Sequence, residues 1–273
     1  REDMVVTVTS GGYIKRTPLI DFRSQRRGGK GMAGMQTKDE DVVTRLFVAN
    51  THTQLLFFTT DGMAYKLKTW RLPLGGRTAK GKAIVNILPI PVGVSIAAIM
   101  PVDVDEKEWD NLQIVFATSA GDIRRNALSD FTNVRSNGKI AMALNEGIEL
   151  VNARIAGEED DVMLFTDSGR AIRFSTTAVR VFKGRKSTGV RGIKLLGKDK
   201  VVSMSVIRHF IATPDERSAY LKMRRAVSGL VDEEGVSDED DVNENATISP
   251  ERYAEMSASE NLILTITSGG AGK

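Results

Sequence analysis

The stretch best suited to binding chemistry combines cationic side chains with glycines near the start of the chain. It comprises Gln25, Arg26, Arg27, Gly28, Gly29, Lys30 and Gly31. Three glycines so close together disfavour a helix, and glycine lets the backbone approach a partner closely. Arginine and lysine supply charges that suit phosphate oxygens. The composition therefore predicts a loop that can hold a nucleic-acid backbone, although a solvated basic turn has the same composition.

No set of residues for catalysis, metal binding or nucleotide binding accompanies this loop. The chain has no cysteine, and its two histidines, His52 and His209, lie far apart, so no metal site is expected. Residues 76–82 fit a P-loop pattern, but Ala83 stands where the magnesium-binding hydroxyl would be. Residues 29–34 fit G-x-G-x-x-G without the surrounding strand and helix. We therefore expect no cofactor and no catalytic activity in this chain itself.

The elements that must position the loop are repeats. Residues 5–16 read as a β-rich run, a tight glycine turn and a second run that ends in cations. The pattern returns in residues 56–66, 114–125 and 163–173, and a last copy starts at residue 263. The first four turn glycines are Gly12, Gly62, Gly121 and Gly169, which are 50, 59 and 48 residues apart. A repeat of this length indicates one structural unit per copy.

Each hairpin is followed by a second glycine loop and two further apolar runs. The glycines of these second loops are Gly31, Gly81, Gly138 and Gly189. Each copy therefore holds about four short strands in about 50 residues, which is typical of propeller-like blades around an axis. The sequence predicts an all-β disc whose blades bury their faces against one another.

Cations recur at matched points of these repeats. At the end of the second hairpin strand lie Lys15, Arg16, Lys66, Lys68, Arg124, Arg125 and Arg173. The second glycine loops carry Arg77, Lys80, Arg135, Arg185 and Lys186. Matched positions of a propeller lie around one ring, so we expect a curved positive stripe that binds duplex phosphates. Solvated strand ends are the alternative.

An insert interrupts the series, and the chain divides into residues 1–207 (four blades), 208–260 (insert) and 261–273 (start of a fifth blade). A capping box and a proline at Thr213, Pro214 and Glu216 predict a helix to about Val227, and a second short helix begins near Pro250. Between them, residues 232–244 hold eight acids and no base. Without these acids the chain carries 38 cations and 27 acids, which indicates a polyanionic partner and an internal competitor for it.

The repeats and the glycine loop resemble the C-terminal DNA-wrapping domain of the A subunit of bacterial DNA gyrase. Residues 25–31 match that family's box, Q-R-R-G-G-(R/K)-G, and residues 49–52, 77–89 and 190–193 are similar to the family as well. The resemblance covers residues 1 to about 207 and resumes at about 262. It implies a β-pinwheel, a propeller-like disc whose blades exchange strands. Such domains usually have six blades, so the four copies, the start of a fifth and the insert depart from the pattern.

The resemblance also implies a function. A domain of this family bends and wraps duplex DNA without reading bases, which lets the whole enzyme introduce negative supercoils. The nucleophilic tyrosine lies in the part of the enzyme that precedes this domain, while ATP and magnesium belong to the B subunit. The implied partners are therefore DNA and both subunits of an A2B2 complex in the bacterial cytoplasm. No apolar run is long enough to span a membrane. The alternatives are the topoisomerase IV wrapping domain, whose box is degenerate, and a propeller scaffold for protein partners.

Overall fold

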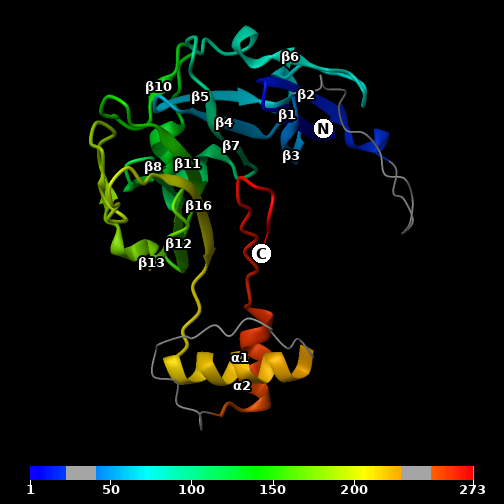
Figure 1. Cartoon of the computed structure of the whole chain (residues 1–273). Coiled ribbons are helices and arrows are strands. Elements are labelled where there is room, and N and C mark those ends of the chain that lie inside the picture. Colours follow the sequence, from blue (N-terminus) through cyan, green and yellow to red (C-terminus); the bar gives the residue numbers. More distant parts are fainter. Residues whose placement is uncertain (23–40, 229–246, 273) are drawn as a thin grey trace. The chain divides into compact units, whose positions relative to one another are not determined.

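The computed structural model describes residues 1–22, 41–228 and 247–272, and Figure 1 shows the whole chain. It divides into two compact units, Arg1–Val206 and Ile207–Lys273. The glycine loop of residues 25–31 and the acidic stretch of residues 232–244 lie outside the described residues. The first unit is all β, as predicted, with four small sheets arranged like the blades of a propeller.

Each blade is built on one of the four predicted hairpins. The hairpin strands are β1 (Asp3–Thr9) with β2 (Tyr13–Pro18), β4 (Gln54–Thr59) with β5 (Met63–Lys68), β8 (Gln113–Thr118) with β9 (Asp122–Ala127), and β12 (Asp160–Thr166) with β13 (Ala171–Ser175). All four pairs are antiparallel. Most first strands of these hairpins are short, nearly continuous apolar runs, such as Gln54–Thr59 and Gln113–Thr118, which is consistent with strands buried on both faces.

A return strand pairs with the first strand of each hairpin. The return strands are β3 (Val43–Asn50), β7 (Ile96–Val102), β11 (Leu150–Ile155) and β16 (Val201–Arg208). In the first three blades the register of this pairing shifts near one end at a bulge, for instance between Val8 and Thr9 of the β1–β3 pair. The return strands lie on the inner side of the row of sheets in Figure 1.

The blades exchange strands in the manner of a pinwheel. Strand β6 (Lys82–Ala83) belongs to the second repeat but pairs with β2 of the first. In the same way β10 (Lys139–Ile140) pairs with β5, and β15 (Val190–Arg191) pairs with β9. Strand β14 (Val181–Phe182) adds a parallel pairing to β9. Each repeat therefore completes the sheet of the repeat before it.

Short 3-10 helices connect the strands. They are η1 (Leu19–Asp21), η2 (Thr69–Arg71), η3 (Ile84–Asn86), η4 (Glu106–Asn111), η5 (Leu128–Phe131) and η6 (Thr176–Ala178). Helix η4 lies in the longer link to the third blade, and its Trp109 is fully buried in the core between the second and third blades. The link therefore contributes to the packing rather than acting as a spacer.

The core lies between successive sheets. Strand β4 shows the arrangement, because Leu55 and Phe57 pack in the cluster shared with the first blade, while Leu56 and Phe58 pack in the cluster shared with the third. Phe58 meets Phe116 edge to face with ring centroids 5.3 Å apart. Burying a side chain of this size contributes roughly 1.5–3 kcal/mol, so strand β4, buried on both faces, ties the second blade to both of its neighbours.

The second unit holds two helices, α1 (Pro214–Ser228) and α2 (Pro250–Ala258). Helix α1 begins with the predicted capping box, in which Glu216 N–H donates to Thr213 Oγ1 at 3.2 Å and Thr213 N–H donates to Glu216 Oε2 at 2.8 Å. The helices pack through Tyr220 and Tyr253, whose ring centroids lie 5.2 Å apart. Arg252 of α2 pairs with Glu216 of α1 at 2.9 Å.

The fifth copy of the repeat forms only the tip of a hairpin. An isolated antiparallel bridge joins Ile266 to Gly272, and no strand is present over residues 261–272. A two-stranded hairpin without a third strand or a packed face is marginal in water. The described residues of this copy have neither.

Candidate nucleic-acid interface

One of the predicted surface cations, Lys15 on β2, is fully buried. Its ammonium group donates to the carbonyl oxygens of Gly76 at 2.9 Å and Arg77 at 2.5 Å. Burial lowers the pKa of Lys15 because the charged form loses water. Both carbonyls belong to the second glycine loop of the next repeat, so Lys15 holds that loop in place.

Arg124 does the same in the third blade. Its guanidinium is fully buried, and Nη1 donates to the carbonyl oxygens of Arg185 at 2.8 Å and Ser187 at 2.6 Å. Nη2 donates to the carbonyl of Ala141. Burial lowers the pKa of Arg124 to about 10, so the side chain stays charged at neutral pH. The loop it holds carries Arg185 and Lys186.

In the second blade, Lys66 donates to the carbonyl of Thr132, in the connection that leads to the next glycine loop. Lys66 also pairs with Glu106 at 2.9 Å. Lys15, Lys66 and Arg124 are named the loop-holding cations below. Together they fix the connections to three successive repeats.

The remaining strand-end cations are paired or buried, with one exception. Arg16 Nε donates to the carbonyl of Leu72 at 2.9 Å, and Arg173 pairs with the buried Asp161 at 2.6 Å. Arg125 is 6% exposed, and its Nε and Nη1 atoms have no hydrogen-bond partner among the described residues. Lys68 is the exception, because its side chain is exposed.

The expectation of an exposed stripe is therefore wrong for Lys15, Arg124 and Arg125. The second hairpin strand is covered by the exchanged strand and loop of the next repeat. The cover is so close that a Cβ on Gly81 would lie 2.5 Å from the carbonyl oxygen of Ile14, and one on Gly189 would lie 2.2 Å from that of Ile123. Both glycines also have positive φ, 81° and 93°, which other residues rarely adopt.

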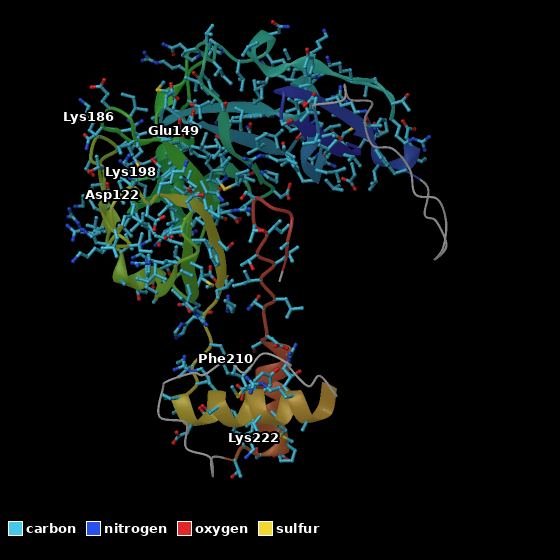
Figure 2. All side chains as sticks on the ribbon, in the orientation of Figure 1. Asp122, Glu149, Lys186, Lys198, Phe210 and Lys222 are labelled. Carbon is cyan, nitrogen blue, oxygen red and sulfur yellow. The ribbon has the colours of Figure 1, made fainter. Side chains whose placement is uncertain are left out.

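The second glycine loops carry cations nearer the surface. Arg135 and Lys186 are exposed, and Figure 2 labels Lys186 at the outer edge of the first unit. Lys80 lies over the ring of Tyr13, 3.8 Å from its centroid, and Arg185 Nη1 donates to the carbonyl of Ile140 at 2.9 Å. Arg77 and Arg185 are partly buried. The loops therefore present Arg135 and Lys186 to solvent, while their other cations serve in part to fix the loop.

The sequence predictions included Arg173, Arg185 and Lys186 but not seven other cations between residues 170 and 200, all of them exposed. Residues 170–200, named the basic segment below, contain ten cations and one acid, Asp199. Asp199 is occupied by the hairpin turn, because it accepts hydrogen bonds from Ser168 Oγ at 2.6 Å and Ser168 N–H at 3.0 Å. The exposed side chains are Arg170, Arg173, Arg180, Lys183, Lys186, Arg191, Lys194, Lys198 and Lys200. The local charge ratio is the signal that could have found them.

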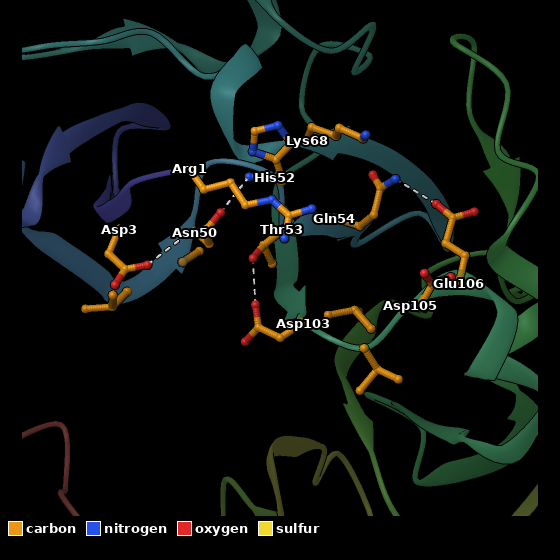
Figure 3. A pocket seen from close by; sticks show the side chains of 14 residues that line it. Arg1, Asp3, Asn50, His52, Thr53, Gln54, Lys68, Asp103, Asp105 and Glu106 are labelled. Atoms are coloured by element: carbon orange, nitrogen blue, oxygen red, sulfur yellow. Dashed lines mark hydrogen bonds between the residues drawn. The ribbon is translucent and has the colours of Figure 1, made fainter.

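One cavity of about 820 Å³ is lined by more acids than cations, in contrast to the basic segment. Figure 3 shows Asp3, Asp103, Asp105 and Glu106 around it, with Thr53 donating to Asp103 at 2.6 Å and Gln54 donating to Glu106 at 2.7 Å. Arg1, Lys68 and His52 also line it, so the acids outnumber the permanent cations. A wall of carboxylates repels phosphate, so this cavity does not suit a nucleic-acid backbone.

Neither a metal site nor a membrane span is found in the part of the chain that the structure describes. No group of three or more histidine or acidic side chains there could hold a metal ion. No helix there is long and apolar enough to cross a membrane. His52 interacts with Thr51 through Nδ1 at 3.1 Å and lines the acidic cavity.

Comparison with known proteins identifies the repeats. The family described as DNA gyrase C-terminal domain, beta-propeller, matches residues 3–50, 53–103, 113–156 and 160–208, one stretch for each blade. This chain belongs to that family. The four matched stretches of this chain coincide with the four hairpins and their return strands. The strand exchange described above is therefore found in a member of the DNA gyrase C-terminal domain family.

Relatives agree with this assignment. The chain is 48% identical over 281 residues to the gyrase A protein of Granulibacter bethesdensis, covering 99% of this chain and 30% of the relative. It is 46% identical over 275 residues to the gyrase A protein of Rickettsia bellii, covering 100% and 30%. The chain thus spans about a third of the length of these gyrase proteins.

Two solved structures have the same fold. A crystal structure of the C-terminal domain of DNA topoisomerase IV superposes with a TM-score of 0.63 at 26% identity, covering 78% of this chain and 62% of that one. A structure of a DNA gyrase A C-terminal domain gives 0.59 at 25% identity, covering 76% and 65%. The β-pinwheel fold of this gyrase-family chain is therefore supported both by its own strand pairing and by these similarities.

Proposed function

We propose that this domain binds and bends duplex DNA around its edge, without reading base sequence. The observation that carries the proposal is the basic segment, where exposed cations face solvent with one occupied acid among them. Membership of the gyrase C-terminal family supports the same role. Exposed lysines and arginines neutralise phosphates and release counterions, which gives affinity that depends on salt rather than on sequence.

The energetics of the task suit a surface of this kind. Bending 20–30 bp of duplex by 40–90° costs on the order of 1–6 kcal/mol. Contacts between phosphates and a curved row of cations offset that cost. A contact that only the bent duplex can make favours bending. The loop-holding cations contribute indirectly, since they fix the loops that carry Arg135, Arg185 and Lys186.

In the whole enzyme, this domain would be a non-catalytic part. It would present a wrapped DNA segment to the rest of the gyrase A protein, and the B subunit would supply ATP hydrolysis with its magnesium. The domain itself would need no cofactor, and the assembly would work on chromosomal DNA in the bacterial cytoplasm. The box of residues 25–31 favours gyrase over topoisomerase IV, whose box is degenerate.

The test is a gel-shift titration of the chain with a 150-bp duplex and an unrelated duplex of equal length, from 50 to 300 mM salt. We expect equal affinity for the two sequences and a steep fall of affinity with salt. Ligation of nicked circular DNA in the presence of the chain should then trap a changed linking number. A protein scaffold would show no salt-dependent DNA binding and no trapped change, and that result would reject the proposal.

A further inference from the structure

A second cavity, of about 660 Å³, lies among the first three blades. Its wall comes from the hairpin turn of the first blade at residues 9–12, from residues 83–96 of the second repeat, and from β11 of the third blade. Its size falls within the range of small-molecule sites. The cavity is separate from the basic segment and from the acidic cavity of Figure 3.

Arg45 of β3 reaches into this cavity as an anchored cation. Its Nη2 atom donates to the carbonyl oxygens of Ala97 at 2.5 Å and Ile96 at 3.5 Å. These bonds connect the first blade to β7 of the second and fix the plane of the guanidinium. Nε and Nη1 have no hydrogen-bond partner among the described residues and are not sealed from solvent. A fixed guanidinium with unused N–H donors is prepared for an anion.

Arg154 of β11 lines the same cavity, and its exposed side chain has no ion pair in the described part of the chain. Burial first, and then the charge of Arg154, lower the pKa of Arg45. The two positive charges thus act on each other. Like charges that share a concave site are unfavourable unless an anion joins them.

Among the described residues, the lining contains no carboxylate that could serve as this anion. Asp41, which contacts the lining residues Gly11 and Ser10, is engaged by the turn, where Gly11 N–H and Ser10 Oγ donate to its Oδ1 at 2.7 and 3.0 Å. Asn152 lines the cavity beside Arg154, but its Nδ2 donates to the carbonyl of Met204 at 3.1 Å. Within the described part of the chain, the end of the cavity that holds Arg45 and Arg154 is therefore positive and uncompensated.

We propose that this cavity binds a phosphate group through Arg45 and Arg154. Two guanidinium charges match the charge of a phosphate monoester near neutral pH, which is close to −2, better than they match a single carboxylate. Part of the remaining lining is apolar, from Ile84, Val85, Ile90, Val94 and Ile96. The ligand is accordingly a small organic phosphate whose body contacts these side chains. It would link the first and third blades, since Arg45 and Arg154 come from β3 and β11.

The test is calorimetric titration of the chain with phenyl phosphate at constant ionic strength, with benzoate as the comparison. We expect phenyl phosphate to bind at least tenfold more tightly than benzoate. R154Q should weaken phenyl phosphate binding at least tenfold, and R154K should retain part of it. The matched control is R71Q, because Arg71 is an exposed arginine of the first unit, stacked 5.3 Å from the ring centroid of Trp70 and absent from the cavity.

Because Arg154 is exposed, R154Q can be made without disturbing a packed core, whereas replacing Arg45 would also remove the bonds that join two blades. Equal binding of phenyl phosphate by wild type, R154Q and R71Q would overturn the proposal, and so would no binding by wild type. A 20-bp duplex distinguishes the source of the phosphate. If R154Q weakens binding of the duplex and phenyl phosphate competes with the duplex for the chain, the site takes a DNA phosphate. If neither R154Q nor phenyl phosphate changes binding of the duplex, the site takes a free ester.

Discussion

The Nη1 atom of Arg124 lies 2.8 Å from the carbonyl oxygen of Arg185, so a buried cation holds the backbone of a loop that itself carries cations. Lys15 repeats this relationship with Gly76 and Arg77 in the first blade. The charges of this domain thus fall into two groups, those that fix the loops and those that face solvent. The two groups should respond differently to substitution.

The first prediction concerns Arg124. Replacing it with methionine removes the donor of the Ala141 and Ser187 carbonyls and leaves the Arg185 carbonyl only the N–H of Ala143, at 3.3 Å. An unsatisfied buried polar group costs about 1–3 kcal/mol, so R124M should lower the free energy of unfolding by about 3 kcal/mol. Amide hydrogen exchange of residues 183–189 should also become faster. Urea denaturation and exchange measurements check both effects.

Arg135 offers the matched control, because its side chain is exposed and lacks a hydrogen bond or ion pair among the described residues. R135M removes the same charge and should change stability by no more than about 0.5 kcal/mol. If R124M and R135M were equally stable, the buried guanidinium would have no loop-holding role.

The repeats and the order of strands could be predicted from the sequence, because glycine turns and β-rich runs are local signals. The burial of Lys15 and Arg124 could not. Both lie inside a strand, Lys15 in β2 and Arg124 in β9, and the glycine loop of the next repeat covers them. The exchange is a tertiary relationship between residues about 60 positions apart, such as Lys15 and Gly76, which local pattern cannot reveal.

The second prediction separates the two groups of cations by salt dependence. Neutralising an exposed lysine of the basic segment, as in K186Q or K198Q, should reduce the slope of log affinity against log salt by about one unit or less for each charge. The slope should be the same for unrelated duplexes. R173Q should have a smaller effect, because Arg173 is already paired with Asp161.

For this prediction, K15M serves as the comparison. Lys15 is fully buried, so its loss should lower stability without changing the salt slope beyond what partial unfolding explains. A slope that fell with K15M but stayed constant with K186Q and K198Q would reverse our assignment of which cations meet DNA. Gel-shift titrations at four salt concentrations provide the slopes.

The third prediction concerns the box of residues 25–31. It rests on the sequence alone, because the box lies outside the described residues. Arg26, Arg27 and Lys30 form the densest cationic loop of the repeat series. Replacing all three with alanine in the full gyrase should abolish negative supercoiling and leave relaxation of supercoiled DNA largely intact. Retained supercoiling at the wild-type rate would refute a role for the box in closing the wrap.

The last prediction concerns the acidic stretch of residues 232–244, with its eight acids and no base. Covalent linkage raises the effective concentration of one segment of a chain around another, so we expect these acids to reach the basic segment. Lys186 is a suitable target, because its side chain is exposed on the loop held by Arg124. We therefore expect the stretch to compete with DNA for the fourth blade, and the competition to weaken as salt screens charges beyond roughly 8–10 Å.

Deleting residues 230–246 should tighten DNA binding most at low salt and lengthen the DNA protected from nuclease. A variant with the same number of glycines and serines in place of the stretch keeps the chain length and removes only the charge. If charge is the cause, both variants should bind DNA more tightly by the same factor. If only the deletion changes affinity, the length of the connection matters and the acids do not. Unchanged affinity and protection in both variants, at every salt concentration, would make the stretch a spacer.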